Sequence, residues 1–387
     1  YLRERSDVLR LIIWNKLTRK IIMDIKVITR HAPSNYGSLL QSIATLRVFK
    51  KLGHDCTVID YRRKDEQGIN SVLSPLKGKA EWNGNFAKKI LYVLLRYPEN
   101  KVAEIKFGKM RNHFLKMTRK CERLQDLKSL SADCFVTGSD QVWGPTMNGD
   151  FDEAYFLSFA SHCRKIAYAA SFGKTQFTEN TVVAYEKLLK RYNAIAVRED
   201  SAVKMLNEWQ IPCEGQVLDP TLMMTGEEWC QFIDKDIDGQ YVLVYQLHNN
   251  PKLCDYAKRF AKQVGLPLLR VSPTFHQFKW GGKFMYLPNL PEFLSLIKNS
   301  SYMITDSFHG TAFALNFNKQ FIEILPNTKT GSRNQSILNL TGLTDRIVTD
   351  YEDFSIAKRE INYVKVNEIL AKEREKSLNI LKKMLSE

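Results

Sequence analysis

Residues 24–61, DIKVITRHAPSNYGSLLQSIATLRVFKKLGHDCTVIDY, predict a strand, a helix and a second strand in succession. A β-branched run begins at Ile25, apolar residues follow at helical spacing, and strand-forming residues return at 56–61. The helical stripe consists of Leu39, Ile43, Leu46 and Phe49. Two strands joined by a helix pair in parallel through a right-handed crossover, so the segment predicts the first unit of a doubly wound sheet. Its turn has no GxGxxG, which excludes the usual dinucleotide fingerprint.

The same alternation continues along the chain in two series. Strand patterns recur at 132–137, 165–170, 194–197 and 216–218, and then at 241–246, 267–271, 302–305 and 321–325, with helices over 251–264 and 310–317. An acidic, turn-rich stretch at 225–240 separates the two series and marks a domain boundary. We therefore predict an α/β protein whose two Rossmann-like domains face a cleft. The N-terminal domain covers 23–225, and the C-terminal domain covers 226–387 and ends in a long helix over 364–385.

Two segments stand apart from this pattern. Residues 62–131 are basic and lack clear strand patterns, which predicts a helical insertion with helices at 86–97 and 102–117 separated by Pro98. Residues 1–22 form a basic amphipathic leader that lacks the apolar centre and cleavage site of a signal peptide. Contact with a membrane surface and a plain surface helix are both open interpretations of this leader.

Composition bounds the class of protein. The 387 residues, 44% hydrophobic and 26% charged, are typical of a folded protein of two or three domains and exclude a small disulfide scaffold. Lys and Arg number 57 against 42 Asp and Glu, which favours anionic partners. The sequence has no nucleic-acid recognition motif, so we do not expect nucleic acid to bind. Seven scattered cysteines show neither disulfide nor metal-ligand spacing. We expect a cytoplasmic protein that needs no metal and no other cofactor.

A turn that follows a predicted strand carries the sharpest chemical signal. In TDSFHGT, residues 305–311, Ser307 is a good N-cap, and Gly310 would let a ligand approach the start of the next helix. Free backbone N–H groups and the positive end of the helix dipole make such a turn an anion site, to which His309 adds a hydrogen bond or a proton. A histidine that only packs the helix start is the alternative.

Three further turns follow strands of the first series. In GSDQVW, residues 138–143, Asp140 and Gln141 suit sugar hydroxyls and Trp143 suits a sugar face, with a buried Trp143 as the alternative. Arg198 ends a strand and suits bidentate binding of a carboxylate or phosphate, with a plain ion pair as the alternative. In SNYGSLLQ, residues 34–41, the asparagine and glycine suit a turn that opens a helix toward the cleft.

Taken together and in this order, these segments resemble the polysaccharide pyruvyl transferase family. The resemblance runs from Met23 to about residue 345 and rests on NYGSLLQ, GSDQVW, YAASFG, VREDSAVKML, VLDPTL and ITDSFHGTAFALNFNKQFI. It implies two domains arranged as in the GT-B glycosyltransferases, with phosphoenolpyruvate as donor and a sugar of a glycan as acceptor. The product would be a cyclic pyruvate ketal, formed with release of phosphate during exopolysaccharide or capsule biosynthesis.

The resemblance also implies roles for individual residues. Arg198 and His309, with Gly310 at the same turn, would bind phosphoenolpyruvate. A third basic ligand would be either Lys329 or Arg333, of which the spacing favours Lys329. His309 is also our candidate for the general acid. The candidates for the base are Asp140 and Asp306. We expect the acceptor to contact Asn35, Tyr36, Gly37, Gln41, Gln141 and Trp143.

Two other functions remain open at this point. One is a glycosyltransferase of the same two-domain shape that uses a nucleotide-sugar donor. The other is a basic protein without enzymatic activity that binds an anionic glycan or a membrane, which the net charge of +15 and the leader favour. For the enzyme we leave open whether the acceptor is lipid-linked and whether the protein contacts the inner face of the cell membrane.

Overall fold

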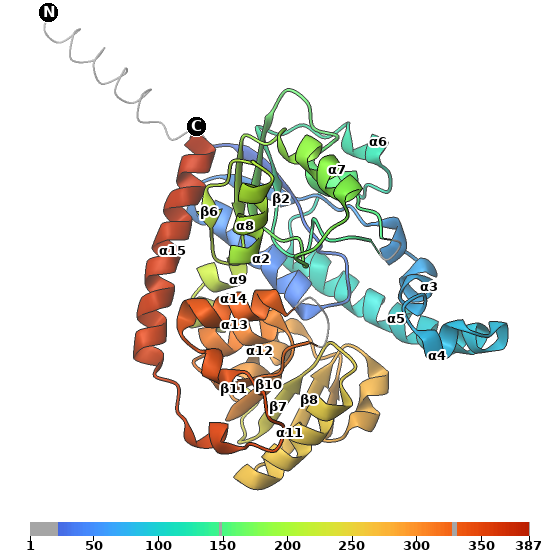
Figure 1. Ribbon diagram of the computed structural model, residues 1–387, viewed down its shortest axis with the longest axis vertical. Coiled ribbons are helices and arrows are strands. Elements are labelled where there is room, and N and C mark those ends of the chain that lie inside the picture. Colours follow the sequence, from blue (N-terminus) through green and yellow to red (C-terminus); the bar gives the residue numbers. More distant parts are fainter. Residues whose placement is uncertain (1–21, 147–148, 327–330, 387) are drawn as a thin grey trace, which may run out of the picture.

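The computed structural model describes residues 22–146, 149–326 and 331–386. It contains two α/β domains, each built on a parallel sheet, one above the other in Figure 1. Of the segments discussed above, residues 1–21 of the leader and Lys329 lie outside the described residues.

The first sheet has six parallel strands in the order β2-β1-β3-β4-β5-β6. They are β1 (Asp24–Ile28), β2 (Asp55–Val58), β3 (Cys134–Thr137), β4 (Arg164–Ala170), β5 (Ala194–Val197) and β6 (Gly215–Gln216). Parallel sheets are covered by helices on both faces, and accordingly all four residues of β3 are buried. Outside the insertion, the helices of this part are α2 (Tyr36–Lys51), α6 (Leu124–Leu127), α7 (Glu179–Leu189), α8 (Asp200–Glu208), α9 (Pro220–Met223) and α10 (Gly226–Cys230).

The second sheet has five parallel strands in the order β11-β10-β7-β8-β9. They are β7 (Val242–Tyr245), β8 (Leu268–Ser272), β9 (Lys283–Tyr286), β10 (Tyr302–Thr305) and β11 (Gln320–Glu323), with helices α11 (Pro251–Val264), α12 (Leu290–Lys298), α13 (Phe308–Asn316) and α14 (Ser332–Thr341). The predicted strands 194–197 and 302–305 and the predicted helix 251–264 are confirmed to the residue. β9 is a short edge strand that the sequence pattern does not predict, because its partly exposed residues show no alternation.

The helical segment inserted after β2 contains α3 (Asn70–Leu76), α4 (Ala80–Asn83) and α5 (Phe86–Phe114). The prediction of two helices separated by Pro98 was wrong, because α5 continues through this proline as one helix. Both halves of α5 are held by packing: Tyr92 joins a small apolar cluster with α3, and Phe107 is part of the main core. Tertiary contacts on both sides of Pro98 thus outweigh the hydrogen bond that the proline removes.

The last helix, α15 (Tyr363–Ser386), returns to the first domain (Figure 1). The Ser377 hydroxyl accepts a hydrogen bond from the Leu218 N–H at 2.9 Å, and Arg164 Nε donates to the Met384 carbonyl at 2.8 Å. The sequence alone assigns this helix to the C-terminal domain, whereas in the structure it packs along both domains.

An apolar contact holds the two domains together beside the site described below. Tyr36, at the start of α2, stacks on Phe293 of α12 with ring centroids 4.0 Å apart, and its hydroxyl donates to the Pro288 carbonyl at 2.6 Å. Both rings belong to one core cluster that contains residues of both sheets. The turns at the carboxyl ends of the two sheets are therefore held face to face.

Candidate functional site

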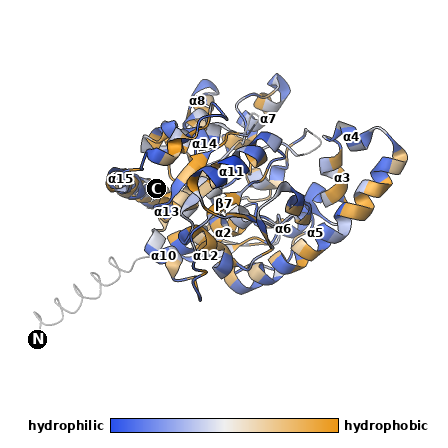
Figure 2. Cartoon of the chain, turned by 90° about the horizontal axis from the view of Figure 1, so that it is seen from below, coloured by the Kyte–Doolittle hydropathy of each residue, from blue (hydrophilic) through white to orange (hydrophobic). Residues whose placement is uncertain are grey.

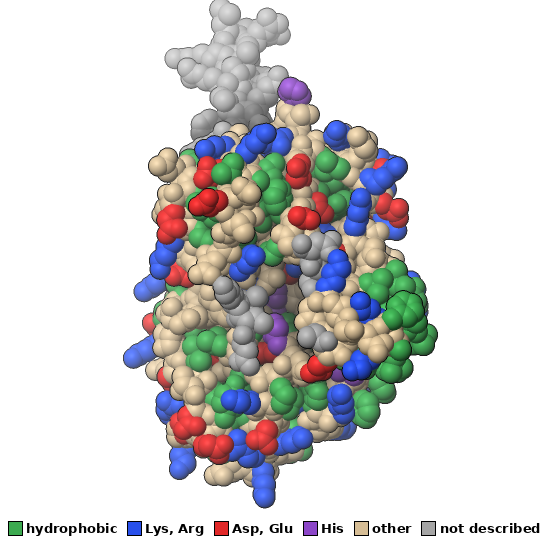
Figure 3. Space-filling view, turned by 45° about the vertical axis from the view of Figure 1, so that its right-hand side comes forward, with side chains coloured by type: hydrophobic (Ala, Val, Ile, Leu, Met, Phe, Trp, Pro, Cys, Tyr) green, Lys and Arg blue, Asp and Glu red, His purple; other side chains and the backbone are tan. Residues whose placement is uncertain are grey.

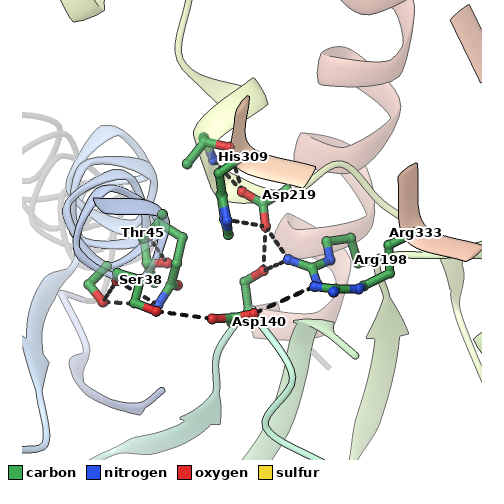
Figure 4. A network of polar contacts seen from close by, with 12 residues as sticks. Ser38, Thr45, Asp140, Arg198, Asp219, His309 and Arg333 are labelled. Atoms are coloured by element: carbon green, nitrogen blue, oxygen red, sulfur yellow. Dashed lines mark hydrogen bonds and ion pairs between the residues drawn. The ribbon is translucent and has the colours of Figure 1, made fainter. Parts of the chain in front are cut away.

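The candidate site lies where turns of the two domains meet (Figure 4). Asp140 follows β3 and Arg198 follows β5, whereas His309 begins α13 after β10 and Arg333 begins α14 after β11. Ligands of open α/β sheets bind beyond the carboxyl ends of the strands, which is where these turns lie. On the molecular surface, Figure 3 shows a hollow with histidine side chains inside it.

Arg198 is the most deeply buried cation of the cluster, with a side chain 1% exposed. Its Nη1 donates to Asp219 Oδ2 at 2.8 Å and to the Ser139 hydroxyl at 3.4 Å. The guanidinium also lies over the Phe308 ring, 4.4 Å from the centroid, which fixes its plane. Burial alone would lower the pKa of Arg198, but the Asp219, Glu199 and Asp140 carboxylates raise it. Arg198 is thus a charged group held in one orientation.

Asp219 is a central residue that the sequence analysis did not select. Its Oδ2 accepts from Arg198 and from the Ser139 hydroxyl at 2.6 Å, and its Oδ1 caps α9 through the Thr221 N–H at 2.9 Å. Burial would raise the pKa of Asp219, but His309 and Arg198 outweigh it and lower the pKa to about 2. The signal was present in VLDPTL, where Asp before Pro is typical of a helix start, but nothing in the sequence placed it beside Arg198.

His309 lies across the domain boundary from Arg198 and against the first turn of α2. Its Nε2 is 3.8 Å from Asp219 Oδ2 and has no hydrogen-bond partner among the described residues. Burial lowers the pKa of His309, although Asp219 and Asp140 oppose the shift. A neutral imidazole in the free protein is therefore favoured, and an approaching anion would favour its protonation.

Asp140 occupies a strained turn between the two domains. Its φ of 74° is in the left-handed region, which is uncommon for residues other than glycine and is concentrated at functional sites. Oδ2 accepts from the Ser38 hydroxyl at 3.3 Å, and Oδ1 is 3.9 Å from Arg198 Nη2 and 4.0 Å from Arg333 Nη1. Burial would raise the pKa of Asp140, but Arg198 and the other nearby cations lower it. Asp140 is therefore an ionised carboxylate between two guanidiniums.

Arg333 brings a second guanidinium to the cluster. When the amide oxygen of Gln141 faces Arg333, it accepts hydrogen bonds from Arg333 Nη1 at 2.9 Å and Nη2 at 2.5 Å. Burial, and then repulsion by Arg198, lowers the pKa of Arg333 to about 10, so the group stays charged at neutral pH. Of the two predicted candidates for the third basic ligand, Arg333 is the one that the structure describes, and it lies at the site.

Several hydrogen-bond donors of this cluster lack acceptors. Within the described chain, the buried Nε and Nη2 of Arg198, Nε2 of His309 and Nε of Arg333 have no hydrogen-bond partner. A buried donor without a partner destabilises the fold by about 1–3 kcal/mol. A ligand with several anionic oxygens would satisfy these groups and relieve the repulsion between the guanidiniums. The arrangement is thus suited to a small, multiply charged anion.

The structure corrects two of the predicted roles. Asp306 does not face this cluster: its Oδ1 accepts from the Leu247 N–H at 2.7 Å and its Oδ2 from the His248 N–H at 2.9 Å, so it holds the turn after β7 and is not free to act as a base. Gly310 does not open a path for a ligand. Its N–H donates to the Ser307 hydroxyl, and a Cβ there would lie 3.0 Å from the Thr305 Cβ, so this glycine allows α13 to pack on β10.

Three predicted acceptor contacts are also wrong, because their side chains are fully buried. Trp143 stacks near Phe156 and donates from its indole N–H to the Tyr155 carbonyl, which leaves no face for a sugar. Tyr36 holds the domain contact described above. Gln41 donates from its amide to the Thr29 hydroxyl at 2.8 Å.

The other predicted acceptor residues lie near an open cavity. Asn35 caps α2 through the Gly37 N–H, and Gly37 lies against His309. Gln141 contacts Arg333 on one side and on the other lines a cavity of about 420 Å³. Arg30, also missed by the sequence analysis, lines the same cavity and forms an ion pair with Glu66. The cavity thus adjoins the cationic cluster through Gln141.

In the described ranges, no group of three or more His, Cys, Asp or Glu side chains is placed to hold a metal ion. All seven cysteines lie in these ranges and are free thiols.

Comparisons with known proteins show the family and the fold of this chain. A family model described as polysaccharide pyruvyl transferase matches residues 35–327, whereas no curated protein matches significantly. The fold is similar to UDP-N-acetylglucosamine 2-epimerase from Rickettsia bellii, with 12% identity and a TM-score of 0.54 over 93% of this chain and 96% of that chain. It is also similar to the S. aureus MnaA–UDP co-structure, with 12% identity and a TM-score of 0.50 over 94% and 97%. At this identity the likeness shows the fold alone, a GT-B-like pair of α/β domains.

Proposed function

The chain belongs to the polysaccharide pyruvyl transferase family, and from this premise we propose that it transfers pyruvate from phosphoenolpyruvate to a sugar of a glycan as a cyclic ketal. The observation that carries the proposal is the set of unpartnered donors on Arg198, His309 and Arg333. Phosphoenolpyruvate has a carboxylate and a phosphate close together, so one molecule can accept from donors of both domains.

In the proposed complex, the two guanidiniums share the anionic oxygens of the donor. Arg198 keeps its bond to Asp219 through Nη1 and offers Nε and Nη2, while Arg333 approaches from α14. His309 reaches the phosphate or the bridging oxygen from α13. Because these groups come from both domains, the site is complete only when the domains are closed, and closure keeps water from the reactive intermediate.

The reaction needs one proton to reach carbon. Protonation of the donor methylene creates the methyl group, and a sugar hydroxyl adds to the neighbouring carbon. The proton of this first hydroxyl replaces the one given to the methylene carbon. Phosphate then leaves, and a second hydroxyl closes the ketal while its proton passes to the phosphate. We propose that His309, protonated when the anionic donor binds, supplies the first proton. Ionised Asp140 would orient the attacking hydroxyl, and its lowered pKa suits this role better than that of a strong base.

The sugar acceptor would enter from the cavity beside Gln141. This cavity is lined by Arg30, Arg62, Glu104 and Tyr97 among others, a set of charged and aromatic side chains that suits sugar hydroxyls and a sugar face. We further propose a cytoplasmic location, since seven free thiols fit a reducing compartment.

The decisive experiment measures both products. The purified protein is incubated with phosphoenolpyruvate and a panel of glycan and glycolipid acceptors, and phosphate release is compared with the appearance of a ketal methyl signal by NMR. In deuterated water, one deuterium should enter each methyl group, because the added proton comes from an exchangeable group. Consumption of a nucleotide sugar, with no phosphate release from phosphoenolpyruvate, would contradict the proposal and favour a glycosyltransferase.

A pair of arginine variants provides the control. Arg333→Ala should abolish turnover and the stabilisation of the protein by phosphoenolpyruvate, since it removes a donor ligand. Arg259→Ala makes the same chemical change at a partly exposed surface ion pair with Asp255 and should leave both unchanged. Equal effects of the two changes would argue against a donor site at Arg333.

A further inference from the structure

Helix α5 carries an apolar surface that nothing in the described chain covers. Its N-terminal half projects from the body of the molecule together with α3 and α4 (Figure 1). Large apolar side chains are exposed along it: Phe86 is 78% exposed and Leu94 is 66% exposed. Figure 2 shows hydrophobic residues along α5, and Figure 3 shows hydrophobic side chains gathered at one edge of the molecule. The exposed set is Phe86, Ile90, Leu91, Leu94, Leu95, Tyr97, Val102 and Ile105.

These residues form a continuous stripe on one side of the helix. Positions 86, 90 and 94, positions 91 and 95, and positions 102 and 105 are three or four residues apart, and positions 95 and 102 are two helical turns apart, so they lie on one side of an α-helix. Tyr92 and Phe107 lie off this stripe and are buried, which fixes the stripe on the outward side. Helix α5 therefore has two apolar sides. The inner side is packed against the rest of the protein, and the second side faces outward. Isolated exposed leucines are common, but a stripe of this length marks an interaction surface.

Basic side chains accompany the apolar stripe. Between residues 77 and 98 there is a single acidic residue, Glu81, against five basic ones, which are Lys77, Lys79, Lys88, Lys89 and Arg96. Farther along α5, Lys101, Lys106 and Lys109 add three basic side chains against Glu99 and Glu104, of which Glu99 pairs with Arg96 and Glu104 with Lys101. An apolar stripe flanked by lysines is typical of helices that lie in the interface of a membrane with anionic lipids.

We propose that α5 docks the protein on a bilayer surface that carries anionic phospholipids. The stripe would enter the boundary between headgroups and acyl chains, and the flanking lysines would contact the headgroup phosphates. The charge pattern favours this partner over a second copy of the chain, because self-association through the stripe would bring like charges together. No helix in the described ranges is long and apolar enough to cross a membrane, so α5 would lie on the bilayer.

The position of the stripe connects it to the candidate acceptor cavity. Tyr97 and Lys101, both on α5, line the cavity of about 420 Å³, and Val102 on the stripe directly follows Lys101. A glycan attached to a lipid in the docked bilayer would thus have its sugar near the cavity and Gln141. This use of the surface rests on the proposed function, whereas membrane docking itself does not.

The test measures vesicle binding of the full chain without any donor. Flotation with phosphatidylcholine vesicles that contain about 30% phosphatidylglycerol should recover the wild-type protein, and pure phosphatidylcholine should recover less. Leu91→Gln with Leu94→Gln keeps helix propensity and should lower the partition coefficient at least about tenfold. Lys88→Glu with Lys89→Glu should remove the preference for anionic vesicles.

Val183→Gln is the matched control, because Val183 is also 66% exposed but lies on α7. It should bind vesicles as the wild type does, and melting temperatures check the fold of each variant. Wild-type vesicle binding by the Leu91/Leu94 variant would overturn the proposal. The proposal would also be overturned if the wild-type protein is a dimer and the Leu91/Leu94 variant is a monomer that still binds vesicles. Turnover of a short soluble acceptor should stay normal in the variant, which separates failure of docking from failure of the proposed reaction.

Discussion

Gly37 lies directly against His309: a Cβ at position 37 would come within 2.9 Å of the His309 Cβ and closer still to its ring. Gly37 is in the first turn of α2 in the first domain, and His309 is in the first turn of α13 in the second. The imidazole is thus positioned by the absence of a side chain across the domain boundary.

Replacing Gly37 should therefore disturb the site without touching its polar groups. We expect Gly37→Ala to displace the imidazole from Asp219, to lower turnover about tenfold or more, and to destabilise the protein by about 1–3 kcal/mol through overpacking. Steady-state kinetics and urea unfolding measure the two effects. Gly108→Ala is the control, since its added Cβ meets only Arg111 Nη2 at 3.8 Å within helix α5. Wild-type turnover in Gly37→Ala would contradict this prediction.

Arg198 should not tolerate a lysine. Arg198→Lys keeps the charge, but an ammonium group cannot hold Asp219 and at the same time present two further N–H groups in a plane. We expect most of the stabilisation by phosphoenolpyruvate to be lost in thermal melts, with a raised KM. The same change at Arg259, on the surface, should have little effect. If Arg198→Lys binds the donor normally, this arginine serves only the ion pair with Asp219.

His309 distinguishes proton transfer from hydrogen bonding. His309→Ala should lower turnover by about 10²-fold or more, the usual contribution of a general acid. His309→Gln offers an amide N–H but no titratable proton, so recovery in this variant would assign His309 to phosphate binding alone. Melting temperatures of both variants should stay near the wild type, because Ser307 still caps the helix. A large fall in melting temperature with parallel loss of activity would support a packing role instead.

Glu323 should make the stability of the second domain depend on pH. Burial raises its pKa to about 8, although hydrogen bonds from Thr311 and Asn334 oppose the shift. Between the ordinary pKa of 4.5 and about 8, the folded protein keeps a proton that the unfolded chain has lost. The free energy of unfolding should therefore fall as pH rises through this window, by up to about 1.4 kcal/mol per pH unit.

Glu323→Gln tests this dependence, because it stays neutral. Its amide oxygen can still accept from Asn334, and its amide N–H can donate to the Thr311 hydroxyl, which in the wild type donates to Glu323. Urea unfolding between about pH 5 and pH 8 should show a flatter profile for the variant, and greater stability than the wild type at the alkaline end. Parallel profiles would rule out a buried protonated Glu323. Glu323→Ala, which loses both hydrogen bonds, should be less stable than Glu323→Gln throughout.

Much of the fold could be predicted because its signals are local. The β-branched run at 194–197 and the amphipathic helix at 251–264 lie within single elements, and their periodicity sufficed. Pro98 misled the prediction because its effect depends on whether both halves of α5 are packed, which is a tertiary property. Trp143 and Tyr36 were misassigned for a related reason. An aromatic side chain after a strand can either contact a sugar or pack in the hydrophobic core, and only its burial in the fold distinguishes the two roles.

Residues close together in the chain are enough to predict the two series of α/β units, the turns that carry chemistry and the resemblance to the family. Which of these turns meet depends on how the two domains pack in three dimensions. In the fold, Asp306 holds the turn after β7, Asp219 lies between Arg198 and His309, and Arg333 contacts Gln141. The physical reason is that charge and burial act through space. The state of a guanidinium or imidazole depends on groups that lie tens or hundreds of residues away in sequence and a few ångströms away in the fold.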